Sequence, residues 1–91
     1  MGPRIDGFYI DDVNEEKFAV HGLTVRRVLE TLQNDYVTIP NRRQRRGLYL
    51  LLGTDNSGGC IAVPIERTRD PGLWRPVTAW SCKEHERAKL P

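Results

Sequence analysis

Residues 47–80 read GLYLLLGTDNSGGCIAVPIERTRDPGLWRPVTAW, and this stretch decides the predicted fold. Residues 48–52 form a continuous apolar run, which is typical of a strand buried on both faces. Residues 60–65 have apolar side chains at every second position, and residues 73–80 form a third predicted strand. Two clusters of turn formers, Thr-Asp-Asn-Ser-Gly-Gly and Asp-Pro-Gly, separate the three strands. Because these connections are too short for parallel crossovers, the sequence predicts an antiparallel meander.

Two helices are predicted before the meander. The first begins at Asp12, whose side chain can form a capping box with Glu15 three residues on. It ends at Gly22, because glycine tolerates the left-handed backbone of a helix C-terminus. The side chains expected to face the core or to lie beside it are Val13, Phe18, Ala19 and Val20.

The second helix is predicted to begin after Thr24 as its N-cap and to end at residues 34–35. Its apolar side chains recur at the spacing of one helical face, which is the clearest amphipathic pattern in the chain. These side chains are Val25, Val28, Leu29 and Leu32. The expected outer face carries Arg26, Arg27, Glu30 and Gln33.

The remaining segments complete a single predicted domain over residues 1–91. Residues 5–10 are expected as an edge strand, residues 36–39 as a short strand, and residues 82–90 as a last helix capped by Ser81. The fold class is therefore predicted as α+β. Two N-terminal helices pack on a small antiparallel meander, a short C-terminal helix follows, and the helices are expected on one face of the sheet.

Composition bounds the class of protein. The 91 residues carry a net charge of +2, with 38% hydrophobic and 29% charged residues, which is a globular balance. No apolar run approaches the ~20 residues of a membrane span, and the N-terminus lacks the pattern of a signal peptide. We therefore expect a cytoplasmic protein. Cys60 and Cys82 lack metal-ligand spacing, so they are expected to be reduced structural thiols without zinc.

Positive charge concentrates in the middle of the chain. A basic loop precedes the meander, with arginines at positions Arg42, Arg43, Arg45 and Arg46. Acidic residues lie mostly near the two ends, so the middle of the chain can present one positive face to a polyanion such as RNA. The alternative is a solvated arginine loop that has no ligand.

Several stretches, taken in order, resemble the BrnT family. Residues 14–24, NEEKFAVHGLT, resemble the family's opening, in which a helix with Asn and Lys closes with His-Gly and a second helix starts at Ser or Thr. Residues 46–53, RGLYLLLG, resemble its Arg-rich entry to an apolar strand. Residues 74–80, WRPVTAW, with a later Glu-Arg pair, resemble the closing motif Arg-x-Ile-Ser-Ala-Arg. The resemblance spans roughly residues 10–88.

The BrnT family consists of ribonuclease toxins of bacterial toxin–antitoxin pairs, with a fold similar to that of the RelE and ParE toxins. The resemblance implies cleavage of RNA without a metal or cofactor. It also implies neutralisation by a small ribbon-helix-helix antitoxin, through which alone DNA is contacted. The family positions that match are Lys17, His21, Arg46 and Arg75. Trp80 stands where the family usually has an arginine.

The residue types also fit this chemistry without the family. RNA cleavage without metal needs a base for the 2′-OH, positive charge at the phosphate and an acid for the leaving 5′-oxygen. Histidine suits the proton transfers because its ordinary pKa lies near neutrality, and arginine suits the phosphate because it donates two parallel bonds. Unstacked bases need aromatic surfaces. The residues expected to bind RNA are Arg42, Arg43, Arg45, Trp74 and Trp80.

Each candidate also has a structural interpretation. His21 can simply complement the negative end of its helix, while Lys17 and His85 can be solvated. Strict alternation places Trp74 and Trp80 on one strand face, where tryptophan is more often part of a core.

Further along the same strand, Arg75 points the other way, and a partly buried arginine there needs an anion or a carboxylate. Pro64 and Pro76 each remove a ladder donor, which predicts edges or bulges at these positions. Two hypotheses remain: a toxin-like endoribonuclease, and a non-catalytic module of the same fold that binds a protein or nucleic acid. The arginine-to-tryptophan departure at Trp80 favours the second. A nucleotide- or metal-dependent enzyme has no supporting motif.

Overall fold

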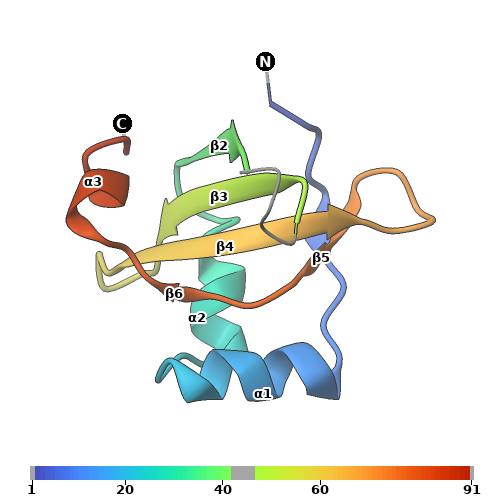
Figure 1. Cartoon of the computed structure of the whole chain (residues 1–91), viewed down its shortest axis with the longest axis horizontal. Helices are drawn as coiled ribbons and strands as arrows, with labels where there is room; N and C mark the ends of the chain where they lie inside the picture. Colours follow the sequence, from blue (N-terminus) through green and yellow to red (C-terminus); the bar gives the residue numbers. More distant parts are fainter. Residues whose placement is uncertain (1, 42–46, 91) are drawn as a thin grey trace.

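The computed structural model describes residues 2–41 and 47–90, and in this part of the chain six strands and three helices form one domain (Figure 1). The strands are β1 (Gly7–Phe8), β2 (Tyr36–Pro40), β3 (Tyr49–Thr54), β4 (Cys60–Arg67), β5 (Leu73–Pro76) and β6 (Trp80–Ser81). The helices are α1 (Asp12–Val20), α2 (Val25–Glu30) and α3 (Glu84–Arg87). The predicted α+β class is confirmed.

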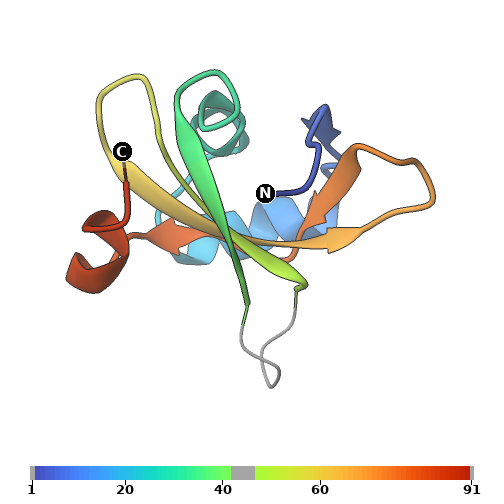
Figure 2. The same cartoon turned by 90° about the horizontal axis from the view of Figure 1, so that it is seen from above.

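The strands form one twisted sheet in the order β1-β5-β4-β3-β2, with β6 also paired to β4 (Figure 2). The pairs β2–β3, β3–β4 and β4–β5 are antiparallel, as the meander predicts, while β1 runs parallel to β5 at the edge. Both predicted turns contain a glycine with positive φ, Gly58 and Gly72, each at 85°. Glycine adopts this conformation without steric cost, so the turn residues fix the connections.

The third strand of the meander is interrupted between β5 and β6. Ile65 of β4 lies opposite Pro76 of β5, whereas Ala62 of β4 lies opposite Trp80 of β6. From one pair to the other, β4 runs over three residues, from 65 to 62, whereas the partner strand runs over four, from 76 to 80. The extra residue is a β-bulge, and it reverses the face toward which the following side chains point.

Two prolines border this interruption, which confirms the expectation of bulges or edges near them. Pro64 lies in β4 beside the gap between β5 and β6, and its carbonyl accepts a hydrogen bond of 2.8 Å from Val77 in the bulge. The carbonyl of Pro76, at the end of β5, accepts from the side chain of Asn14 on α1. Because neither proline can donate an N–H to a ladder, a continuous strand pair is disfavoured here.

The cap of α1 lies one residue earlier than predicted. Asp11, not Asp12, is the N-cap: its Oδ1 accepts from the N–H of Asn14 at 3.0 Å, and Asn14 Oδ1 accepts from the N–H of Asp11 at 2.8 Å. The predicted partner Glu15 takes no part in this cap. The reason is tertiary, because the fully buried Asn14 amide also donates to two carbonyls outside the helix.

The buried face of α1 also differs from the prediction. Phe18 is fully buried, but Val13 and Val20 are 54% and 79% exposed and Ala19 is exposed as well. The short helix contacts the sheet through the stripe of Asn14 and Phe18, four residues apart, and turns its valines to solvent. The expectation that these small apolar residues face the core was therefore wrong.

The second helix is shorter than predicted. Thr24 caps it as expected, with Oγ1 accepting from the N–H of Arg27 at 3.2 Å, but α2 ends at Glu30. Val28 is buried, whereas Leu29 is 37% exposed. Glu30, predicted on the outer face, is buried because its carboxylate accepts the N–H of Asn56 in the β3–β4 turn. A local helical pattern cannot anticipate this distant partner.

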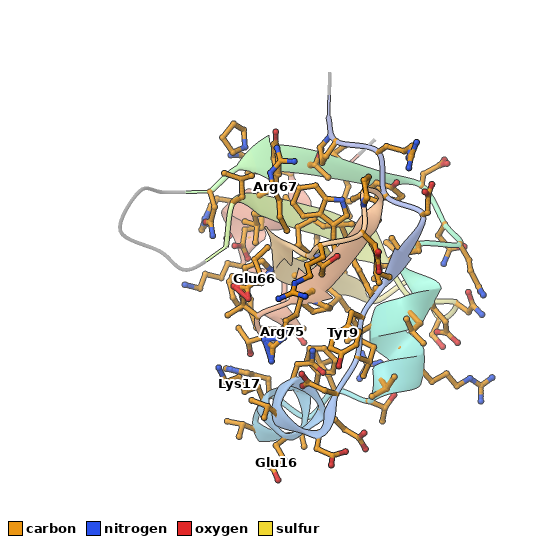
Figure 3. All side chains as sticks on the ribbon, turned by 90° about the vertical axis from the view of Figure 1, so that its right-hand side faces the viewer. Tyr9, Glu16, Lys17, Glu66, Arg67 and Arg75 are labelled. Atoms are coloured by element: carbon orange, nitrogen blue, oxygen red, sulfur yellow. A yellow bond between two sulfur atoms is a disulfide. The ribbon has the colours of Figure 1, made fainter. Side chains whose placement is uncertain are left out.

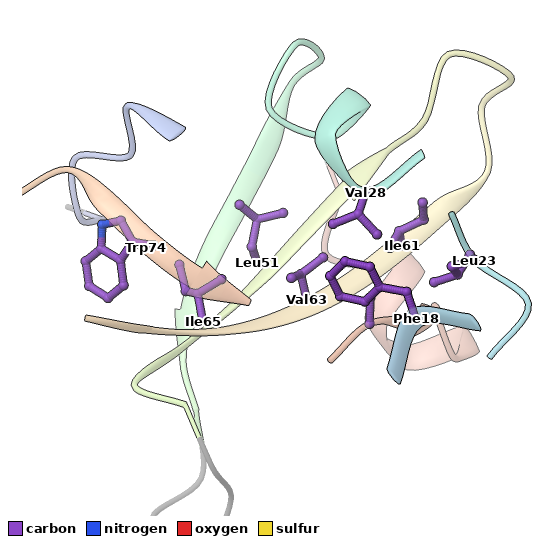
Figure 4. Close-up of a cluster of buried hydrophobic side chains, with 9 residues drawn as sticks. Phe18, Leu23, Val28, Leu51, Ile61, Val63, Ile65 and Trp74 are labelled. Atoms are coloured by element: carbon purple, nitrogen blue, oxygen red, sulfur yellow. The ribbon is translucent and has the colours of Figure 1, made fainter. Parts of the chain in front are cut away.

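The sheet has a different cover on each face. The larger core lies between the sheet and α1 and α2 (Figure 4). Its buried members are Phe18, Leu23, Val28, Leu51, Ile61, Val63, Ile65, Trp74 and Ala79. A smaller cluster of Leu50, Leu52 and Ala62 lies on the opposite face, where Trp80, Cys82 and Leu90 pack against it. The prediction of helices on one face is wrong for α3, whose segment covers this second face.

Cys60 and Cys82 form a disulfide, with a Cα–Cα distance of 5.3 Å, so the predicted reduced thiols are not what the structure contains. The register explains the bond. Ile61 pairs with Ser81, so residues 60 and 82 come next in the same antiparallel ladder, and the N–H of Cys82 donates to the carbonyl of Cys60. Ser81 lies in β6 instead of capping a helix.

Candidate functional site

One pocket brings together two residues that the sequence singled out. It has a volume of about 560 Å³ and is lined by His21, Thr78, Trp80, Ser81 and Lys83. The imidazole comes from the C-terminal end of α1, and the other side chains come from β6 and the residues beside it. We call this the His21 pocket. It combines a group suited to proton transfer, an ammonium, an indole ring and two hydroxyls.

A Schellman motif holds His21 at the surface. The N–H of Leu23 donates to the carbonyl of Phe18, and the N–H of Gly22 donates to the carbonyl of Ala19. Gly22 has φ of 72°, which confirms its predicted role in ending the helix. Leu23 and Phe18 are buried in the same core, so the helix end is anchored while His21, as the C-cap, remains exposed.

The β-bulge places Trp80 in this pocket. Trp74 precedes the bulge and belongs to the helix-covered core, whereas Trp80 follows it and packs on the opposite face. The prediction that both rings share a strand face was therefore wrong, because strict alternation fails where one strand carries an extra residue. Only Trp80 remains partly exposed beside a pocket.

Glu86 positions two residues of the pocket. Its Oε1 accepts from Trp80 Nε1 at 3.0 Å and from the backbone N–H of Lys83 at 2.8 Å, and the side chain is buried, with 6% of its surface exposed. Sequence reasoning missed both Glu86 and Lys83 as site residues. The spacing of Lys83 and Glu86 resembles the start of a helix, and this signal could have identified the contact.

Arg75 lies away from the His21 pocket. Its guanidinium contacts Asp11, the N-cap of α1, at 3.0 Å and Glu66 at 3.7 Å, and Figure 3 shows Arg75 beside Glu66. His21 is at the other end of that nine-residue helix, roughly 13 Å along its axis. The two predicted catalytic residues therefore do not face one phosphate, and carboxylates already neutralise Arg75.

The position of Lys17 is intermediate. It lies on α1 four residues before His21, is partly buried, and does not line the His21 pocket. Residues four apart in a helix share one face, so Lys17 and His21 lie on the same side of α1. His85 is exposed on α3, as its structural interpretation predicted.

Trp74 is unsuited to stacking on a base. The indole is 4% exposed and donates from Nε1 to the carbonyl of Arg4 at 2.9 Å. Tyr49 packs against it edge-on at 5.6 Å, and the Arg67 guanidinium lies over the ring at 5.3 Å. The alternative interpretation of Trp74 as a core residue is confirmed, and this burial gives no support to the prediction that Trp74 binds RNA.

The arginines of the basic loop were also among the predicted site residues. The predicted catalytic Arg46 and the predicted RNA contacts Arg42, Arg43 and Arg45 lie outside the described residues. Among residues 2–41 and 47–90, no group of three or more His, Cys, Asp or Glu side chains could hold a metal ion.

A second pocket, of about 540 Å³, has a structural carboxylate in its wall. Asp55 accepts from the N–H groups of Gly59 and Ser57 and from Arg27 Nε, at 2.8, 2.9 and 2.9 Å. The hydrogen bond from Gly59 is the main reason that the pKa of Asp55 lies below its ordinary value of 3.8, and Arg27 adds to the lowering against the effect of burial. These bonds fix the β3–β4 turn to α2, so the carboxylate is already occupied.

Comparisons with protein-family models, curated proteins and solved structures found no match for this chain. Within the described ranges, no helix combines the length and the apolar character that crossing a membrane requires.

Proposed function

We propose that this chain is a metal-independent endoribonuclease toxin of the BrnT type, with the RelE-like fold of that family, and that RNA binds in the His21 pocket. One observation carries the proposal: His21 lines the same pocket as Trp80 and Lys83, although it lies far from those two residues in the sequence. An imidazole, a ring and a cation are the three components that binding and cleaving an unpaired RNA segment require.

Each component has a distinct role in the proposed reaction. His21 accepts the proton of the ribose 2′-OH as this oxygen attacks the adjacent phosphorus; the bond from phosphorus to the 5′-oxygen breaks, and the imidazolium gives the proton to this leaving oxygen. The products are a 2′,3′-cyclic phosphate and a free 5′-hydroxyl, so no water or metal is consumed in this step. Lys83 supplies positive charge near the phosphate, and one preorganised donor at a developing negative charge is worth about 10²–10³ in rate.

The second candidate is a module that binds RNA or an antitoxin without cleaving. Arg75 favours it, because Asp11 and Glu66 neutralise this guanidinium at a distance from His21. Trp80 at the position of the family's arginine favours it as well. In both cases the proposed protein partner is a small ribbon-helix-helix antitoxin, and DNA is reached only through that partner. A gene for such a protein beside this one would support either candidate.

Cleavage and binding are separated by one experiment. Single-stranded RNA is incubated with the purified protein in EDTA, and products and complexes are followed in parallel. We expect the parent protein to produce cyclic phosphate ends and His21→Ala to bind RNA but to cleave it at least 100-fold more slowly. Arg75→Lys, which keeps the charge between the two carboxylates, is the matched control and should cleave normally.

The outcomes assign the function. Binding without cleavage by the parent protein selects the binding module. Cleavage that persists in His21→Ala removes His21 from the reaction, and failure of the parent protein to bind RNA at all rejects the His21 pocket as an RNA site.

A further inference from the structure

The side of the His21 pocket formed by Trp80 and Lys83 is fixed by one buried carboxylate. Glu86 Oε1 accepts from both residues, at 3.0 Å from the indole nitrogen and 2.8 Å from the backbone nitrogen of Lys83. The ring also packs against the cluster of Leu50, Leu52 and Ala62. A ring held at its nitrogen and supported by apolar side chains is pre-organised, so a ligand loses little additional side-chain freedom on contact.

The free part of this ring determines which ligand fits. Trp80 is partly exposed and lines a pocket whose other side chains are polar or cationic. An aromatic ring beside a cation matches one nucleotide, whose base has an apolar face and whose phosphate is an anion. The hydroxyls of Thr78 and Ser81 can exchange hydrogen bonds with a base edge or a ribose 2′-OH.

We propose that the His21 pocket takes a single unpaired nucleotide of RNA, with its base stacked on Trp80 and its phosphate near Lys83, and that Glu86 is the positioning residue. This inference rests on the proposed function and specifies its substrate class. Bases within a duplex are stacked on one another and are not available to a side chain, so single strands bind and duplexes are excluded.

The chain allows a direct spectroscopic test, because it contains two tryptophans, Trp74 and Trp80. In a Trp74→Phe background, the emission of Trp80 reports on the pocket alone. The probe is a hexanucleotide with 2′-O-methyl groups, which cannot be cleaved, offered as a single strand and as a duplex. We expect the single strand to quench the emission and the duplex to bind at least tenfold more weakly.

Substitutions at the ring separate stacking from general attraction. Trp80→Leu is expected to weaken single-strand binding by about 5- to 150-fold, the range that stacking of one base on an aromatic side chain provides. Trp80→Phe, which keeps a flat ring, should recover most of the affinity. Trp74→Phe is the matched control and should bind as the parent does, since that ring is buried in the other core.

Substitutions at Glu86 test its positioning role. Glu86→Ala is expected to shift the Trp80 emission and weaken binding, whereas Glu86→Gln retains an acceptor oxygen and should restore both. Thermal unfolding of each variant identifies any that fails to fold. If Glu86→Ala fails to fold, the comparison of Glu86→Gln with the parent protein still tests the positioning role.

The results distinguish this inference from the proposed function. Equal binding of single strands and duplexes, or unchanged affinity in Trp80→Leu, overturns the stacking inference and leaves RNA cleavage at this surface intact. Glu86→Gln that behaves like Glu86→Ala overturns the positioning role. Absence of RNA binding by the parent protein overturns the proposed function itself.

Discussion

The two faces of the sheet each hold one tryptophan, but the hydrophobic clusters on the two faces differ in size. On the helix-covered face, Trp74 belongs to a cluster of nine buried side chains closed by α1 and α2. On the opposite face, Trp80 packs on a cluster of three, which is covered by the segment from Cys82 to Leu90. That segment is held by a disulfide and by the buried carboxylate of Glu86.

This difference separates stability from recognition. Apolar burial on the helix-covered face provides most of the free energy that holds the fold, because that face removes more apolar surface from water. On the opposite face, part of the Trp80 ring remains exposed beside the His21 pocket. The Cys60–Cys82 disulfide compensates for the small hydrophobic cluster on this face. The following predictions test this division, from the largest expected effect to the smallest.

Phe18→Ala should damage the helix-covered face most. The side chain is fully buried at the centre of the cluster, so its removal leaves a cavity in contact with both the sheet and α2. We expect the free energy of unfolding to fall by about 3–5 kcal/mol, measured by urea unfolding. A loss below roughly 1 kcal/mol would mean that this core is not the main source of stability.

Opening the disulfide should loosen the opposite face selectively. The bond joins residues separated by 22 positions, and cross-links of this span contribute about 3 kcal/mol. We expect Cys60→Ser with Cys82→Ser, or the reduced parent protein, to lose about this amount and to show faster amide exchange in residues 82–90. Equal acceleration in α1 would contradict the independence of the two faces. In a reducing cytoplasm the same opening would occur, so the assay is made in both redox states.

Asp55 tests the attachment of α2 to the sheet. Its pKa is lowered in the folded protein, so its contribution to stability is full above the ordinary value of 3.8 and is lost as the pH falls through the lower folded value. Asp55→Asn keeps acceptor capacity but loses the charge that faces Arg27. We expect this variant to be less stable than the parent at pH 7 and less sensitive to acid, as followed by thermal unfolding from pH 7 to pH 2. Parallel acid profiles would show that other carboxylates cause the loss.

Val20→Ser is the smallest expected change and the control for Phe18→Ala. Both residues lie on α1, but Val20 is 79% exposed. We expect the free energy of unfolding to change by no more than about 0.5 kcal/mol in the same urea assay. A larger loss would contradict the solvent exposure of this side chain.

Part of the fold could be predicted from short stretches. Thr24 as a cap, Gly22 as a helix end and the two glycine turns were correct, since each depends on backbone geometry within a few residues. The strands of the meander followed from apolar patterning. The cap of α1 was wrong by one position because Asn14 also bonds to carbonyls outside the helix, one of them the distant carbonyl of Pro76.

The candidate site was predicted in part. His21 and Trp80 were chosen for their chemistry, and the structure brings them into one pocket. Lys83 and Glu86 were missed, because their importance depends on contact with Trp80 across a turn. Arg75 was chosen as a phosphate ligand, yet its two carboxylate neighbours come from other elements that sequence spacing does not relate to it.

The sequence by itself determined the positions of the turns, the C-terminal end of α1, the N-cap of α2 and the α+β class, because local sterics and backbone hydrogen bonds act over a few residues. Only the tertiary structure decided which face each tryptophan occupies, whether the two cysteines form a disulfide, and which charged side chains are paired. These outcomes depend on strand register, and one inserted residue in a ladder reverses every side chain that follows it.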